Sequence, residues 1–345
     1  MNIYRIDFNI YNKGFNCMSK KLLLTVNVIT YNHAPYIAKC LDSILSQKTN
    51  FRFIIRIFDD CSTDGTLEIC YRYAKKYPNT VFLFPSEKNL GIVYNPLRSY
   101  EEISTPYYLF IEGDDYRINK YGFQRQIDAL EKYPECSFCC ANTINEKNGK
   151  FGDIHPCLGG GRYAKEDILE NPDILFYTHL MTRIVRTKYI NIDPEYTAAY
   201  LNDISQMYEL LDQGPFYFIP DIFGCYVITG KGIVTSKKLF SKVQMSFEAC
   251  YNYDIYSKNK YELNILNFFI IDIISFYQEQ KKYMISDCKK NIINYVNHTN
   301  KKKSSIVKWM HTFRAILYLF IPGILPYIAH KVRDFFRYAR KRISK

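Results

Sequence analysis

Short apolar runs alternate with longer amphipathic stretches through the first part of the chain. The apolar runs cover residues 22–29, 53–58, 81–84 and 107–111. Runs of this length, bounded by polar residues, predict buried strands. After Pro35 and after Thr66, apolar positions recur every three or four residues, which predicts helices between the strands. This alternation predicts an α/β fold with a mainly parallel sheet.

Polar residues directly follow three of the four predicted strands. The first strand is followed by Thr30, Tyr31 and Asn32, the second by Asp59 and Asp60, and the fourth by Glu112, Asp114 and Asp115. Ligands of parallel α/β sheets bind outside the carboxyl ends of the strands. We therefore expect a ligand site where these three polar segments meet.

The acidic segment after the fourth strand suggests a metal ion. Two carboxylates about 5 Å apart repel each other by roughly 3 kcal/mol at an effective dielectric constant near 20. A divalent cation would neutralise Glu112, Asp114 and Asp115, and ligands that are all oxygen favour Mg²⁺ or Mn²⁺. Mg²⁺ often binds through one or two carboxylates plus substrate phosphates, which points to a nucleoside diphosphate. The alternative is a solvated acidic turn.

Five short segments occur in an order that is more specific than any one of them. They are residues 28–32 (VITYN), 36–47 (YIAKCLDSILSQ), 59–66 (DDCSTDGT), 89–91 (NLG) and 112–116 (EGDDY). Together they resemble family 2 glycosyltransferases of the GT-A fold. The resemblance covers residues 22–141, including an expected helix over residues 123–133, and thins beyond them. It implies a GT-A, Rossmann-like α/β fold with a mixed, mainly parallel sheet flanked by helices.

The resemblance also implies a binding site for a nucleotide sugar. Thr30 and Tyr31 would line the pocket for the nucleotide base, and Asp60 would accept a hydrogen bond from a ring nitrogen of that base. Asn32 would also belong to the binding site for the nucleotide sugar. The alternative for Asp60 is a turn-capping role, which Asp64 fills more naturally because it lies just before a predicted helix.

Two asparagines and the acidic segment complete the implied donor site. Asn89 and Asn95 fall where the family approaches the ribose and diphosphate, although asparagine is also an ordinary loop residue. The acidic segment resembles the DxD signature of the family with glutamate in the first position. Asp114 and Asp115 would bind the metal and diphosphate, and Glu112 would face the donor sugar or ribose. Mg²⁺ or Mn²⁺ would neutralise the charge on the leaving nucleoside diphosphate.

Sugar transfer also needs a general base, because the acceptor alcohol must lose its proton as the new bond forms. In the family this base is an aspartate in a later segment, and the match here is Asp203 in the sequence LNDISQMY. Asp203 precedes a predicted helix, so it is also a candidate N-cap, and the two roles are compatible. The resemblance implies inversion at the sugar carbon.

One segment departs from the family pattern. The family commonly has an arginine and a histidine in the segment that here reads YVITGKGI, and this chain has Val227 and Thr229 at those positions. A threonine hydroxyl is a weaker metal or phosphate ligand than an imidazole. Either Lys231 supplies positive charge to the diphosphate from a Gly-Lys-Gly loop that closes over the donor, or the enzyme is slow or inactive. The alternative for this loop is a surface turn.

The cysteines indicate a reducing environment. The chain has eleven cysteines, an odd number, and shows no secretory signal pattern, which favours free thiols and a cytoplasmic location. Cys136 and Cys139 form a CxxC, but no second pair or histidine cluster completes a zinc site. They lie in a strand-like run, so we expect them to pack in the core.

Four regions are expected along the chain. Residues 1–17 form an N-terminal extension, with Met18 as an alternative start. Residues 18–141 form the nucleotide-sugar-binding half of a GT-A domain, and residues 142–240 form the acceptor-binding half. Residues 241–345 form a helical C-terminal region.

The net charge of +12 is concentrated at the C-terminus. Residues 301–345 contain twelve lysines or arginines and one acid, Asp334, around an apolar block at residues 315–329. This block is too short to span a bilayer, which needs about 20 residues. Basic and apolar residues together predict reversible attachment to an anionic membrane surface. The alternative is a helical cap with solvated charges.

The sequence therefore favours an inverting, metal-dependent glycosyltransferase at the inner face of the cell membrane. It would move a sugar, by family frequency from a UDP-sugar, to a glycan or lipid-linked glycan in surface polysaccharide or lipopolysaccharide biosynthesis. One alternative is a catalytically weak scaffold that binds a sugar nucleotide. Another is a nucleic-acid-binding protein that uses the basic tail. The second alternative leaves the acidic segment unexplained, so we expect no nucleic-acid partner.

Overall fold

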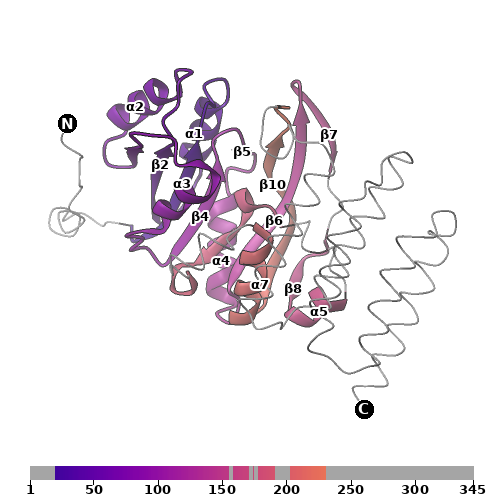
Figure 1. The fold of residues 1–345 in the computed structure, drawn as a ribbon. Coiled ribbons are helices and arrows are strands. Elements are labelled where there is room, and N and C mark those ends of the chain that lie inside the picture. Colours follow the sequence, from indigo (N-terminus) through magenta and orange to yellow (C-terminus); the bar gives the residue numbers. More distant parts are fainter. Residues whose placement is uncertain (1–19, 155–157, 171–173, 175–177, 191–202, 231–345) are drawn as a thin grey trace, which may run out of the picture. The chain divides into compact units, whose positions relative to one another are not determined.

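The computed structural model describes residues 20–154, 158–170, 174, 178–190 and 203–230 (Figure 1). These residues belong to one of the two units into which the chain divides. The expected extension over residues 1–17, Lys231 and the C-terminal region over residues 241–345 lie outside the described residues. No helix in the described part is long and apolar enough to cross a membrane.

The first half of the sheet is built from the four strands that the apolar runs predict. These strands are β1 (Leu22–Thr30), β2 (Arg52–Asp59), β3 (Val81–Pro85) and β4 (Tyr107–Glu112). They lie in the order β3-β2-β1-β4, and all neighbours are parallel. The predicted parallel half of the α/β fold is therefore confirmed.

The second half of the sheet is mixed. β6 (Phe138–Lys147) pairs in parallel with β10 (Phe216–Val227), and the short β9 (Ile184–Arg186) lies antiparallel between β4 and β6. Shorter antiparallel pairings add β5 (Tyr116–Arg117), β7 (Lys150–Ile154) and β8 (Gly161–Tyr163). In the described part these strands form one ten-stranded sheet, in agreement with the expected mixed sheet.

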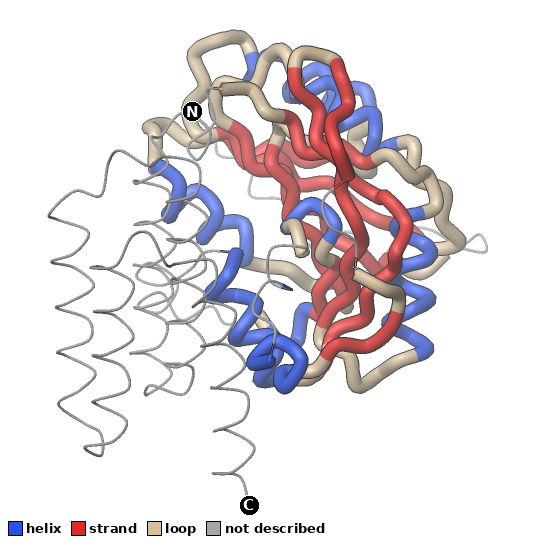
Figure 2. The backbone as a smooth tube through the Cα atoms, turned by 90° about the vertical axis from the view of Figure 1, so that its right-hand side faces the viewer, coloured by secondary structure: helices blue, strands red, loops and turns tan. Residues whose placement is uncertain are grey.

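Helices lie on both sides of the strand layer (Figure 2). The α-helices are α1 (Ile37–Leu45), α2 (Thr66–Lys76), α3 (Gly91–Tyr100), α4 (Gly122–Lys132), α5 (Lys165–Glu170) and α7 (Asp203–Gln213). Two 3₁₀ turns are η3 (Leu180–Thr182) and η4 (Thr187–Tyr189). The helices predicted before the second and third strands, after the acidic segment and after Asp203 are all present, and α3 is an addition.

The two faces of β4 pack against different elements, and Glu112, the last residue of the strand, belongs to one of these faces. The odd-numbered side chains from 107 to 111 belong to the main hydrophobic core with α1 and α4. Tyr108 and Phe110 lie on the opposite face, where their rings contact Tyr100 at the end of α3. Tyr108 also accepts a hydrogen bond from α7. Because side chains alternate along a strand, Glu112 lies on the face that α3 and α7 cover.

The CxxC cysteines pack in the core, as the sequence predicts. Cys136 and Cys139 are both fully buried and belong to the main hydrophobic cluster. Burial raises the pKa of the Cys139 thiol well above its ordinary value, so this thiol stays protonated.

Gly214 joins α7 to β10 in a space that has no room for a side chain. A Cβ atom at this position would overlap the backbone carbonyl oxygen of Glu135. We expect Gly214→Ala to lower the free energy of unfolding by about 1–3 kcal/mol, because the backbone must shift to admit the methyl group. Urea denaturation measures this change. Gly152→Ala is the control, since a Cβ there lies 3.8 Å from its nearest neighbour; equal effects of the two substitutions would contradict the argument.

Candidate functional site

Three strand ends meet at one edge of the sheet, as the polar segments predict. β1 lies between β2 and β4, and its last residues pair with theirs, Thr30 with Asp59 and Ile29 with Glu112. Backbone hydrogen bonds continue past the strands, from the Gly113 N–H to the Ile29 carbonyl at 2.8 Å. The segments after β1, β2 and β4 therefore lie beside each other.

The acidic triad, Glu112, Asp114 and Asp115, lies at this edge. One carboxylate oxygen from each residue lies within 4.8 Å of the others, and no other His, Cys, Asp or Glu cluster in the described residues has such spacing. The side chain of Asp114 is 11% exposed and Asp115 is 4% exposed. The Oδ1 atom of Asp114 is buried and has no hydrogen-bond partner among the described residues. A divalent cation with oxygen ligands fits this donor set.

The triad carries negative charge that the protein does not fully compensate. Burial raises the pKa of Asp115 well above its ordinary value, and the charges of Asp114 and Glu112 raise it further. A hydrogen bond of 2.9 Å from the Val227 N–H to Asp115 Oδ1 offsets a part of this effect. Burial also raises the pKa of Asp114, and His33 acts in the opposite direction. A bound cation would reverse these shifts, because it favours the charged carboxylates.

Asp115→Asn is expected to stabilise the metal-free protein near neutral pH. A raised pKa means that the folded state disfavours the charged carboxylate, so stability rises as the pH falls through the folded-state pKa. Removing one of three close charges should add about 1–3 kcal/mol at pH 7.5, while the amide oxygen can still accept the Val227 N–H. Urea denaturation in EDTA at pH 7.5 and pH 5 tests this. The difference in the free energy of unfolding between the variant and the wild type should be smaller at pH 5 than at pH 7.5. A larger difference at pH 5 would contradict the raised pKa of Asp115.

His33 is a site residue that the sequence analysis did not single out. Its Nε2 atom lies 3.9 Å from Asp114 Oδ2, and its Nδ1 atom is buried without a partner among the described residues. Gly113 makes this approach possible, since a Cβ there would lie 2.8 Å from Thr30 Oγ1 and 3.0 Å from His33 Nδ1. A lone histidine after the first strand gave no pattern that predicts this contact.

Asp60 is engaged in holding the start of α3. Its two carboxylate oxygens accept backbone N–H groups from Leu90 at 2.7 Å and Gly91 at 2.9 Å. The capping role that the sequence left open for Asp60 is thus present. Asp64 also caps, because its Oδ1 accepts the Thr66 N–H at the start of α2. The hydrogen bond from a base to Asp60 remains a prediction, for which each carboxylate oxygen still has a free lone pair.

The segment after β1 offers both fixed and exposed groups. Thr30 is buried, and its Oγ1 has no partner among the described residues. The Tyr31 side chain is 45% exposed. Asn32 has a positive φ of 55°, and its Oδ1 accepts the Thr63 N–H at 2.8 Å. Asn32 therefore joins the loops after β1 and β2, while Tyr31 is accessible to a ligand.

The two asparagines of the α3 region differ. The Asn89 amide donates to the Asp60 carbonyl at 3.3 Å, and the residue is exposed. Asn95 is 2% exposed. Its amide donates to the Phe58 carbonyl at 3.2 Å, and its Oδ1 accepts the Arg98 Nε–H at 2.8 Å. Asn95 thus ties α3 to β2, and both its amide nitrogen and its amide oxygen have partners within the protein.

Two residues that the sequence singled out in the second half of the domain lie at element ends, Val227 at the end of β10 and Asp203 at the start of α7. Val227, where the family commonly has a charged side chain, reaches the triad through its backbone N–H. Asp203 is the first residue of α7, the helix that covers the Glu112 face of β4, but its side chain is outside the described structure. Lys231 also lies outside the described residues.

Residues 25–191 match the model of glycosyl transferase family 2. Over these residues the chain is similar to family 2 glycosyltransferases. Its fold agrees with solved structures. The Staphylococcus aureus TarS fragment 1–349 with UDP-GlcNAc has a TM-score of 0.60 at 18% identity and covers 91% of this chain and 89% of its own. A mannosyltransferase of Pyrobaculum calidifontis with GDP-Man and Mn²⁺ has a TM-score of 0.51 at 12% identity, covering 87% and 81%. The GT-A fold expected from the sequence is confirmed.

The relatives of the chain include proteins with and without a stated activity. An uncharacterized protein of Mycobacterium bovis is 31% identical over 135 residues, which are 39% of each chain. The poly(ribitol-phosphate) beta-glucosyltransferase of Bacillus spizizenii is 26% identical over 210 residues, 52% of this chain and 32% of that protein. The chain thus spans about a third of the length of the relatives that it matches.

Proposed function

We propose that this protein transfers a sugar from a nucleotide sugar, a UDP-sugar first among them, to a hydroxyl group of a glycan or lipid-linked glycan. The observation that carries the proposal is the acidic triad at the end of β4, beside the ends of β1 and β2. This is the edge where ligands of parallel α/β sheets bind.

The donor would bind across the three strand ends. Thr30, the exposed Tyr31 ring and Asp60 would contact the base, and Asn89 lies at the same loop for the ribose. Glu112 would face the donor sugar or ribose. Two structures of the same fold contain nucleotide sugars, UDP-GlcNAc in one and GDP-Man with Mn²⁺ in the other, which supports this class of ligand.

Asp114 and Asp115 would hold Mg²⁺ or Mn²⁺ together with the donor diphosphate. When bound, the ion supplies Lewis-acid stabilisation of the charge on the leaving nucleoside diphosphate. The burial of both carboxylates supports this assignment, as does the Asp114 Oδ1 atom, which has no hydrogen-bond partner in the described part of the chain. Val227 would contribute by keeping Asp115 oriented through its backbone N–H.

Asp203 would act as the base. The acceptor oxygen forms a bond to the anomeric carbon, its proton passes to the Asp203 carboxylate, and the bond from that carbon to the diphosphate breaks with its electron pair leaving on the diphosphate. Attack opposite to the leaving group inverts the anomeric centre. The position of α7 on the Glu112 face of the sheet supports this role.

The acceptor we propose belongs to a surface glycan made at the inner face of the membrane. The Bacillus spizizenii relative is a poly(ribitol-phosphate) beta-glucosyltransferase, so poly(ribitol phosphate) is the first acceptor to test. The basic residues of 301–345 would hold the protein at the membrane.

A ligand panel tests the proposal. The full chain is titrated with UDP, GDP, UDP-GlcNAc and GDP-mannose in thermal-shift and calorimetric experiments, with MnCl₂ and then with EDTA. A true donor at a hundredfold excess over its dissociation constant should stabilise the fold by about 2.7 kcal/mol, and EDTA should remove this effect. If none of the four ligands stabilises the protein with Mn²⁺, the enzyme interpretation fails.

A scaffold that binds a sugar nucleotide without turning it over is the second candidate. Val227 and Thr229 favour it, since neither side chain replaces the charge of the family's usual arginine and histidine. An assay for release of the nucleoside diphosphate from the sugar nucleotide that binds best, with poly(ribitol phosphate) present, distinguishes the enzyme from the scaffold. Binding without any release over several hours would favour the scaffold.

A further inference from the structure

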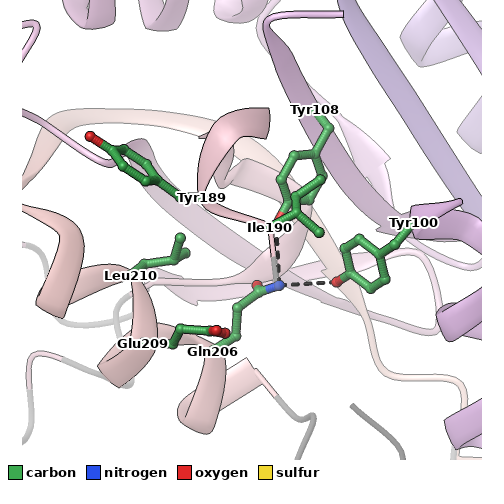
Figure 3. A pocket seen from close by; sticks show the side chains of 7 residues that line it. All are labelled: Tyr100, Tyr108, Tyr189, Ile190, Gln206, Glu209 and Leu210. Carbon is green, nitrogen blue, oxygen red and sulfur yellow. Dashed lines mark hydrogen bonds between the residues drawn. The ribbon is translucent and has the colours of Figure 1, made fainter. Parts of the chain in front are cut away.

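A buried polar cluster connects α7 to the donor half of the domain. Gln206 of α7 is 6% exposed. Its Nε2 donates to the hydroxyl of Tyr100 at 3.0 Å and to that of Tyr108 at 3.3 Å (Figure 3). Its Oε1 accepts a hydrogen bond of 3.1 Å from the guanidinium of Arg183. One side chain thus joins three elements, α7, the end of α3 and the start of β4, and also the residue before β9.

The cluster fixes the relative positions of its side chains and has no room for a ligand. The cavity beside it has a volume of about 10 Å³, which is space for about one water molecule. Burial raises the pKa of Tyr100 to about 12, so its hydroxyl stays neutral. The neutral hydroxyls and the amide therefore act as directional hydrogen-bonding groups inside the protein.

Gln206 lies where it can fix the start of α7. It follows Asp203, the first helical residue, by three positions, and residues three apart lie on neighbouring positions of one helix face. Its partner Tyr108 lies on the same face of β4 as Glu112. The helix also packs through the apolar side chains of Met207, Leu210 and Leu211, and Asp212 in its last turn forms a 2.8 Å ion pair with Lys165 of α5. Apolar contacts are non-directional and the ion pair lies in the last turn, so the Gln206 hydrogen bonds act on the rotation of the first half of the helix.

We propose that Gln206 is a positioning residue, which holds the first turn of α7, and with it Asp203, in register with the acidic triad. The inference rests on the proposed function, because Asp203 is the group that it positions. Proposed donor contacts come from the loops after β1, β2 and β4 and do not involve α7. Loss of Gln206 should therefore change turnover and leave donor binding intact.

A double-mutant cycle with Asp203 tests this. The variants are Gln206→Leu, Asp203→Asn and their combination, with Tyr108→Phe as a milder change that removes one acceptor hydroxyl. Gln213→Leu is the matched control, since Gln213 is an exposed residue of the same helix. The first readout is turnover, measured in the presence of Mn²⁺ as UDP released from UDP-GlcNAc or as the nucleoside diphosphate released from the best donor of the panel. The acceptor is water or poly(ribitol phosphate). The second readout is the dissociation constant of that nucleoside diphosphate, measured by calorimetry.

Gln206→Leu should lower kcat by ten- to about a hundredfold, as a displacement near 1 Å does elsewhere. The dissociation constant should stay within twofold, Tyr108→Phe should show a smaller loss of kcat, and Gln213→Leu should match the wild type. In the Asp203→Asn background the effect of Gln206→Leu should fall below twofold, because residues that act through one group are not additive.

Two results overturn the inference. One is an unchanged kcat in Gln206→Leu and Tyr108→Phe; if Gln206→Leu does not fold, Tyr108→Phe alone decides. The other is a loss that persists undiminished in the Asp203→Asn background, which means that Gln206 acts on something other than Asp203. Failure of the proposed function is seen separately. It appears as absent nucleotide binding in the wild type, or as full activity of Asp203→Asn, and either result also removes the positioning role.

Discussion

Replacing Asp114 and Asp115 together by asparagine is expected to abolish the Mn²⁺-dependent binding of the nucleotide. The two residues supply two of the three carboxylates of the triad, and a neutral amide oxygen binds a hard divalent cation much more weakly. Replacing residues that only support metal ligands already costs about 10- to 100-fold in affinity, so the loss here should be at least about 100-fold. Without the cation, the donor diphosphate would also meet the negative charge of Glu112.

Calorimetric titration with Mn²⁺, and with UDP in the presence of Mn²⁺, measures both losses. Asp128→Asn combined with Asp221→Asn is the matched control, because it removes the same charge from two exposed positions away from the triad. The control should bind both ligands as the wild type does. Unchanged Mn²⁺ affinity in the Asp114→Asn, Asp115→Asn variant would refute the metal assignment.

The strand ends could be predicted from the sequence because local patterns determine them. An apolar run followed abruptly by polar residues marks the carboxyl end of a buried strand, as at Ile29 and Ile111. Parallel pairing then brings the ends of β1, β2 and β4 to one edge. The meeting of Thr30, Asp60 and the acidic triad thus follows from periodicity and the rules of α/β folds.

The helix α3 could not be predicted in the same way. Pro96 lies inside it, and proline ordinarily disrupts a helix interior. Asp60 supports its start by accepting the Leu90 and Gly91 N–H groups across 30 and 31 positions of sequence. The Asp60 carboxylate, which the family resemblance assigned to the nucleotide base, is therefore also a structural cap. Only the tertiary structure shows this second role.

Other contacts of the site depend on residues that are distant in sequence. The Val227 N–H reaches Asp115 across 112 positions, and Gln206 reaches Tyr100 across 106. His33 contacts Asp114 because Gly113 leaves space for it. Periodicity describes neighbours along one element, so it carries no information about such pairs.

Asp203→Asn is expected to lower turnover by about 10²- to 10⁴-fold, the usual contribution of a general base, with little change in nucleotide affinity. Asparagine has nearly the same size as aspartate but cannot accept the acceptor proton. The donor contacts proposed here come from the β1, β2 and β4 loops, so binding of the nucleotide should remain within about twofold by calorimetry, well under the 1.4 kcal/mol that a tenfold change requires.

The same substitution separates the catalytic role from a role in stabilising the start of α7. Asp203 is the first residue of the helix, so the N-cap position lies one residue before it, and a carboxylate in the first turn adds about 0.3–1 kcal/mol through the helix dipole. If Asp203 is the base, Asp203→Asn and Asp203→Ala should lose turnover to similar extents. If Asp203 only stabilises the start of the helix, Asp203→Asn should be as active as the wild type. Retained turnover in the asparagine variant would therefore place the base elsewhere, and it would leave the acidic triad as a donor site whose acceptor side is still to be found.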